Sequence, residues 1–74
     1  MKKNKYRIIG VDFDETLAHT RGIYPKIGEP VIEVMDYILE EQKKGAYLIL
    51  ITMREGDELD MAVRWCNEHG IVFD

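Results

Sequence analysis

The sequence predicts a single α/β domain, residues 1–74, built on a parallel sheet. Apolar segments rich in β-branched residues, at 6–13, 46–51 and 71–73, alternate with two segments whose apolar residues recur every three or four positions. This alternation is typical of a β-α-β-α-β arrangement, which is half of a doubly wound sheet. The composition, 46% hydrophobic and 32% charged, is that of a globular protein and argues against disorder.

The first strand is expected at residues 6–13, where both faces are apolar, as in a parallel sheet covered by helices. Residues 17–29 contain Gly22, Pro25 and Gly28 and are expected to form a loop or a short hairpin. This loop is too short to hold a large additional domain, so a site beside it is expected to be open.

The first helix is expected from about Pro30 to Lys44, because proline suits the first turn of a helix and Gly45 suits its end. Its apolar stripe consists of Val31, Val34, Met35, Ile38 and Leu39. The second strand, residues 46–51, follows directly.

The second helix is expected to open at Gly56-Asp57, with Asp57 as N-cap, and to end at Gly70. Its buried stripe consists of Leu59, Ala62, Val63 and Cys66. Residues 71–73 are expected to form the third strand.

Polar side chains stand where the first two strands end. Asp12 and Asp14 are two positions apart at the carboxyl end of the first strand, and Thr52 ends the second. Ligands bind at this edge of open α/β sheets. Two carboxylates so close together repel each other, and Mg²⁺ would relieve that repulsion because carboxylates are its usual protein ligands. The pattern therefore predicts a Mg²⁺ site at Asp12 and Asp14.

The run Asp12–Thr16 resembles the first motif of the haloacid dehalogenase (HAD) superfamily, Asp-x-Asp-x-Thr, and Thr52 stands where the family places a Ser or Thr. The stretches 24–30, 52–56 and 65–70 look like those of small capless HAD-type hydrolases of bacteria and their phages. The resemblance covers nearly the whole chain. It implies a Rossmann-like three-layer core with strand order 3-2-1 that lacks the C-terminal half of the usual fold.

The resemblance also implies a phosphatase chemistry on a small phosphorylated substrate. Asp12 would be the nucleophile that forms an aspartyl-phosphate, and Asp14 the general acid and base. Mg²⁺ would lie on the Asp12 carboxylate and the Asp14 backbone carbonyl. Thr52 would bind a phosphoryl oxygen. Thr16, grouped with the substrate-binding residues, would steady the turn that aims Asp14. Arg54 is the internal candidate for a phosphate-binding cation, with a solvated loop arginine as an equal alternative.

Two parts of the family's machinery, a phosphate-binding Lys or Arg and the distal acids, usually lie beyond the length of this chain. Lys43, Lys44 and His69 are expected at the opposite edge of the sheet. Asp74 is expected at the site's edge but roughly 10 Å from the first strand, at two strand spacings, which is too far to share a metal. The alternative function is therefore a non-catalytic HAD-like module that binds metal, phosphate or a protein. A receiver-like signalling domain is less favoured. Its phosphoacceptor normally lies on the third strand, whereas here the acidic pair follows the first strand.

The composition limits the kinds of partner that the chain is expected to bind. The net charge of −4 argues against a nucleic-acid binder, and no apolar run approaches the roughly 20 residues that span a bilayer. The single cysteine, Cys66, allows no intrachain disulfide and suits a cytoplasmic location. With only half of the sheet present, the strand at residues 8–13 would have a free apolar edge. We therefore expect self-association or pairing through that edge.

Overall fold

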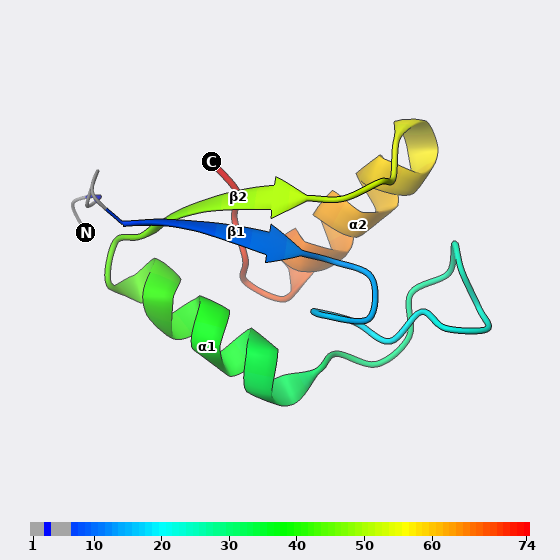
Figure 1. Ribbon diagram of the computed structural model, residues 1–74, viewed down its shortest axis with the longest axis horizontal. Helices are drawn as coiled ribbons and strands as arrows, with labels where there is room; N and C mark the ends of the chain where they lie inside the picture. The colour runs from blue at the N-terminus through cyan, green and yellow to red at the C-terminus, as the bar shows by residue number, and fades with distance from the viewer. Residues whose placement is uncertain (1–2, 4–6) are drawn as a thin grey trace.

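The computed structural model describes Lys3 and residues 7–74, which form two strands and two helices. The strands lie side by side in one sheet (Figure 1). The elements are β1 Ile8–Asp12, α1 Ile32–Lys43, β2 Tyr47–Ile51 and α2 Gly56–Glu68. The two strands are parallel, with Ile8 paired to Tyr47 and Asp12 paired to Ile51. The chain is thus a small parallel α/β fold, as predicted. Residue 6, where the first strand was expected to start, lies outside the described residues.

The helices cover one face of the sheet. Val11 and Leu48, which point to that face, are buried together with residues of both helices. Side chains alternate between faces along a strand, so Ile8, Ile49 and Ile51 point the other way, and all three are exposed. The expectation that both faces of the first strand are covered is therefore wrong for the described residues.

The predicted third strand is also wrong, because residues 71–73 form no strand and the described sheet has the order β1-β2. The chain returns from α2 to the base of β2 and reaches the ladder at its last residue. There the Asp74 amide donates to the Leu48 carbonyl at 2.8 Å, and the Leu48 amide donates to the Asp74 carboxylate at 2.9 Å. Leu48 is the second residue of β2, so Asp74 lies at the amino-terminal edge of the sheet, with Lys3 3.1 Å away. Asp74 does not face the predicted site.

Gln42 of α1 takes the place of a strand partner for the segment that leads to Asp74. Its side-chain amide donates to the Gly70 carbonyl at 2.8 Å, and its side-chain oxygen accepts the Val72 amide at 2.7 Å. The segment is therefore held to a helix rather than to the full length of β2, which explains the missing ladder.

The helix boundaries follow backbone geometry. α1 begins two residues after Pro30, because Pro30 forms a β-bridge with Ala18 and Val31 is still extended, at φ −87° and ψ 99°. α2 begins at Gly56, so the N-cap position falls on Glu55 and not on Asp57, which lies in the first turn. The acidic residues of that turn still suit the positive end of the helix dipole.

The core joins the covered face of the sheet, both helices and the turn after β1. Its buried members are Val11, Phe13, Leu17, Ala18, Met35, Ile38, Ala46, Leu48, Ala62, Cys66 and Ile71. In the part of the chain that the structure describes, no helix is both long and apolar enough to cross a membrane.

Candidate active site

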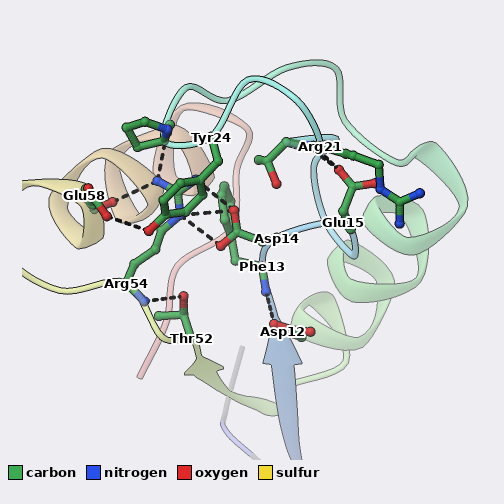
Figure 2. A network of polar contacts seen from close by, with 11 residues as sticks. Asp12, Phe13, Asp14, Glu15, Arg21, Tyr24, Thr52, Arg54 and Glu58 are labelled. Atoms are coloured by element: carbon green, nitrogen blue, oxygen red, sulfur yellow. Dashed lines mark hydrogen bonds and ion pairs between the residues drawn. The ribbon is translucent and has the colours of Figure 1, made fainter.

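Asp12 stands exposed at the carboxyl end of β1 (Figure 2). One carboxylate oxygen accepts the amide of Phe13 at 2.9 Å, and the other lies 3.4 Å from the Thr16 hydroxyl, which donates to it. These contacts fix the carboxylate and leave it open to solvent. An oriented, accessible carboxylate of this kind can act as a nucleophile or as a metal ligand.

A tight turn follows and carries Asp14 back toward α2. The Phe13 carbonyl accepts the amides of Thr16 at 3.1 Å and Leu17 at 2.9 Å. Glu15 closes this turn in a left-handed conformation, at φ 59°, which a non-glycine residue adopts only at some cost. Thr16 lies within this turn, next to the strained Glu15.

The Glu15 side chain holds the start of the loop at residues 17–29. Its carboxylate accepts the backbone amides of Thr20 and Arg21, the latter at 2.6 Å. These hydrogen bonds favour the ionised form and lower the pKa of Glu15 below its usual range. The loop is therefore anchored to the turn that bears the candidate site.

Arg54 forms a bidentate ion pair with Asp14 through two parallel hydrogen bonds. Its Nε donates to Oδ2 at 3.0 Å and its Nη2 to Oδ1 at 2.8 Å, while the Arg54 side chain is fully buried (Figure 2). Nη1 donates to the backbone carbonyls of Pro25 at 3.0 Å and Glu58 at 3.2 Å. One guanidinium thus joins the Asp14 turn, the loop and α2.

Two aromatic rings enclose the same guanidinium. Its central carbon lies 5.1 Å from the ring centre of Phe13 and 4.7 Å from that of Tyr24, both within the range of cation–π attraction. The Tyr24 hydroxyl donates to the Glu58 carboxylate at 2.5 Å, and this contact raises the pKa of Tyr24. The contact between Tyr24 and Glu58 is not evident from the sequence. No local pattern marks it, because Tyr24 and Glu58 are 34 positions apart.

The ion pair sets the charge of Asp14. The hydrogen bonds from Arg54 hold the pKa of Asp14 below its usual range and raise the pKa of Arg54, against the opposing effect of burial. Asp14 is therefore a carboxylate at neutral pH and has no proton to donate in this arrangement. Arg54, with its donors engaged and its side chain buried, does not offer a cation to a phosphate at the surface in this conformation.

Thr52 follows β2 at the same edge as Asp12, as predicted, because Asp12 pairs with Ile51 in the preceding ladder. Its hydroxyl accepts the Arg54 amide at 3.1 Å and remains partly accessible. Strand pairing thus brings Asp12 and Thr52 to one edge, and Arg54, two residues after Thr52, holds the Asp14 carboxylate through its side chain.

The residues fit a Mg²⁺ ion in part. Among residues 3 and 7–74, no group of three or more His, Cys, Asp or Glu side chains is placed to hold a metal. The Asp14 carboxylate, predicted as a ligand, is held by Arg54. The exposed Asp12 carboxylate remains available, and Mg²⁺ commonly binds one or two carboxylates and completes its shell with water and substrate phosphate.

Comparison with known proteins gives one informative similarity. No protein-family model matches the sequence, and no curated protein matches it significantly. A solved structure, that of a conserved protein coded by a locus from Bacteroides thetaiotaomicron, is similar to this chain, with 39% sequence identity and a TM-score of 0.79. The similarity covers 89% of this chain and 53% of that chain. This chain thus spans about half the length of the protein that it resembles.

Proposed function

We propose that this chain belongs to the HAD superfamily and carries the nucleophile of a Mg²⁺-dependent phosphohydrolase that acts on small phosphorylated substrates. The observation that carries the proposal is Asp12. It is an exposed carboxylate at the carboxyl end of a parallel strand, oriented by the Phe13 amide, with Thr52 at the end of the neighbouring strand. Ligands of open α/β sheets bind at this edge.

In the proposed reaction an Asp12 oxygen attacks phosphorus. A bond forms from that oxygen to phosphorus while the ester bond breaks, and the leaving oxygen takes a proton. Water then attacks the aspartyl-phosphate, which restores the Asp12 carboxylate and releases phosphate. The Thr52 hydroxyl supports the reaction by donating to a phosphoryl oxygen. Mg²⁺ on the Asp12 carboxylate and the Asp14 backbone carbonyl would offset negative charge on the phosphoryl group.

Asp14 is the proposed proton donor to the leaving oxygen and the base for the attacking water. Its pairing with Arg54 keeps it ionised, so the donor role requires that pairing to loosen when the substrate binds. Aryl phosphates leave as stable phenolates and need little protonation. The chain should therefore hydrolyse aryl phosphates better than alkyl phosphates.

The test is hydrolysis of a generic aryl phosphate with and without Mg²⁺. We expect Mg²⁺-dependent turnover that is lost in Asp12→Asn and retained in Asp36→Asn, a matched control on the exposed side of α1. Circular dichroism of both variants shows whether they remain folded. Equal turnover by wild type and a folded Asp12→Asn variant would rule out Asp12 as the nucleophile.

A second candidate function is a non-catalytic module that binds metal or phosphate. The observation that favours it is the Asp14–Arg54 ion pair, because the Asp14 carboxylate that would serve as the general acid is held by Arg54. This candidate predicts chemical-shift changes at Asp12 on addition of Mg²⁺ and inorganic phosphate, without turnover of even a reactive aryl phosphate. Turnover that depends on Asp12 would exclude it.

A further inference from the structure

We propose that Glu15 is a positioning residue, which keeps the Asp14 carboxylate in place by acting through the loop at residues 17–29. The Glu15 carboxylate hydrogen-bonds to the start of that loop and makes no contribution of its own to the reacting atoms. The placement of Asp14 is a property of the fold. Only the consequence of that placement for turnover rests on the proposed phosphohydrolase function.

Glu15 is an unusual residue for the backbone position that it occupies. Its φ of 59° lies in the left-handed region, which glycine adopts freely and which asparagine and aspartate adopt more readily than glutamate. Among the described residues, every other positive φ belongs to a glycine. A strained backbone persists only where surrounding contacts compensate for it. The contacts of the Glu15 side chain supply that compensation.

The Glu15 carboxylate fixes Thr20, and Thr20 contacts two further parts of the site. One oxygen of Glu15 accepts the amides of Thr20 and of the residue after it. The Thr20 carbonyl accepts the Tyr24 amide at 2.8 Å. The Thr20 side chain is buried, and its hydroxyl adds to Arg54 in stabilising the ionised Asp14 carboxylate. Thr20 therefore links Glu15 to Asp14 and to Tyr24.

Tyr24 lies over the guanidinium that holds Asp14. Its ring centre is 4.7 Å from the central carbon of Arg54, and its hydroxyl donates to the Glu58 carboxylate at 2.5 Å (Figure 2). Tyr24 is 52% exposed, whereas the Arg54 side chain is fully buried, so the ring shields one side of the guanidinium from water. An ion pair is stronger when water is excluded from it. Through the loop, Glu15 thus supports both groups that hold Asp14.

In the proposed reaction, the placement of Asp14 matters most for hydrolysis of the aspartyl-phosphate. Water attacks phosphorus, the bond from phosphorus to the Asp12 oxygen breaks, and Asp14 takes a proton from the water. Asp12 is held by the Phe13 amide and the Thr16 hydroxyl, which are not part of the loop. Loss of the Glu15 carboxylate should therefore slow hydrolysis of the intermediate while its formation continues.

Nuclear magnetic resonance of the Arg54 side chain tests the placement directly. The Nε–H signal of Arg54, assigned by its loss in Arg54→Lys, reports exchange with water at the ion pair. In Glu15→Gly, which removes both the carboxylate and the backbone strain, we expect this exchange to become about tenfold faster in a folded chain. Glu15→Gln should keep the wild-type rate, because its side-chain oxygen still accepts the loop amides. Glu29→Ala, which removes an exposed carboxylate at the end of the same loop, should also keep it.

The same signal can refute the proposal. An unchanged rate in folded Glu15→Gly would overturn it, since Glu15 would then act only within its own turn. A faster rate that Glu15→Gln shares would also overturn it, because the missing acceptor would not be the cause. If circular dichroism shows that Glu15→Gly does not fold, Glu15→Asp takes its place. Aspartate tolerates the left-handed backbone but has a shorter reach, so a wild-type rate in Glu15→Asp would contradict the proposal.

Turnover of an aryl phosphate with Mg²⁺ gives the second readout. In Glu15→Gly we expect kcat to fall about tenfold, while the fraction of chains that carry a phosphoryl group on Asp12 after acid quench rises above that of wild type. A fall of both in the same proportion would indicate a loss of folded chain and would contradict the positioning role. If wild type forms no phosphorylated Asp12, the phosphohydrolase proposal fails. The exchange rate of the Arg54 signal then decides by itself whether Glu15 positions Asp14.

Discussion

Replacing Arg54 by methionine tests how much of the structure depends on one buried cation. The change removes every hydrogen bond from the Arg54 side chain to Asp14 and one each to the Pro25 and Glu58 carbonyls. Removing one partner of a buried ion pair costs about 3–5 kcal/mol. The Asp14 side chain is 29% exposed, so water can solvate the carboxylate that is left, and the lower end of that range, about 3 kcal/mol, applies.

A loss of this size is a large part of the total. At roughly 0.05–0.15 kcal/mol per residue, a chain of this length has a free energy of unfolding of about 4–11 kcal/mol. With about 4–8 °C per kcal/mol for a small domain, the midpoint of thermal unfolding should fall by about 12–24 °C. The loop at residues 17–29 should also lose order, because Arg54 holds its Pro25 carbonyl.

Urea and thermal unfolding followed by circular dichroism measure this effect. Arg64→Met is the matched control, since Arg64 lies exposed on the same helix as Glu58 and should change stability by less than about 0.5 kcal/mol. Arg54→Lys should be intermediate, because an ammonium keeps the charge but cannot form the two parallel bonds. A loss below about 1 kcal/mol in Arg54→Met would refute the central position of this ion pair.

Three further predictions follow from other contacts. Because Arg54 holds the pKa of Asp14 below its usual range, the stability that its ionised form contributes is present above the ordinary aspartate pKa of about 3.9. That stability is lost as the pH falls through the lower folded-state pKa, so urea midpoints between about pH 5 and pH 2 should fall more steeply in wild type than in Asp14→Asn, and equal slopes would contradict this. Burial raises the pKa of the Cys66 thiol to about 12, so a disulfide reagent should label it only as the protein opens, and immediate labelling of the folded chain would disprove this. Gln42→Ala should destabilise the chain by about 1–2 kcal/mol and speed hydrogen exchange at the Val72 amide, whereas unchanged exchange would show that the Gln42 contacts are unimportant.

The sequence predicted the elements that depend on local periodicity. The two strands and two helices fall within one or two residues of their expected cores, because apolar spacing and glycine positions determine them. The placement of Asp12 and Thr52 at one edge also followed, since residues that end two parallel strands meet at the same edge. The sequence therefore located the candidate site without any structural information.

The contacts that the sequence did not reveal join distant positions. Asp14 and Arg54 are 40 positions apart, and their pairing depends on a turn, a strand end and a loop that come together only in the fold. Glu41, which is not part of the apolar stripe of α1, is buried and pairs with Arg7 and Lys44. Charged residues of this kind look the same in sequence whether they are solvated or paired.

The third strand failed for a related reason. Its apolar composition suited a strand, yet Gln42 captures the backbone of Val72, and Asp74 alone reaches β2. Side-chain hydrogen bonds of this type compete with ladder formation and carry no periodic signal. Asp74 consequently lies at the edge opposite Asp12, where it has no access to the candidate site.

The most direct measurement of the central claim is acid-quenched mass spectrometry of the chain after incubation with Mg²⁺ and a reactive aryl phosphate. This experiment asks only for the first chemical step and therefore does not require complete turnover. The account predicts one added phosphoryl group, located by peptide mapping on Asp12 and absent from Asp12→Asn. A phosphoryl group on another residue, or none on a folded wild-type chain, would contradict the assignment of Asp12 as the nucleophile.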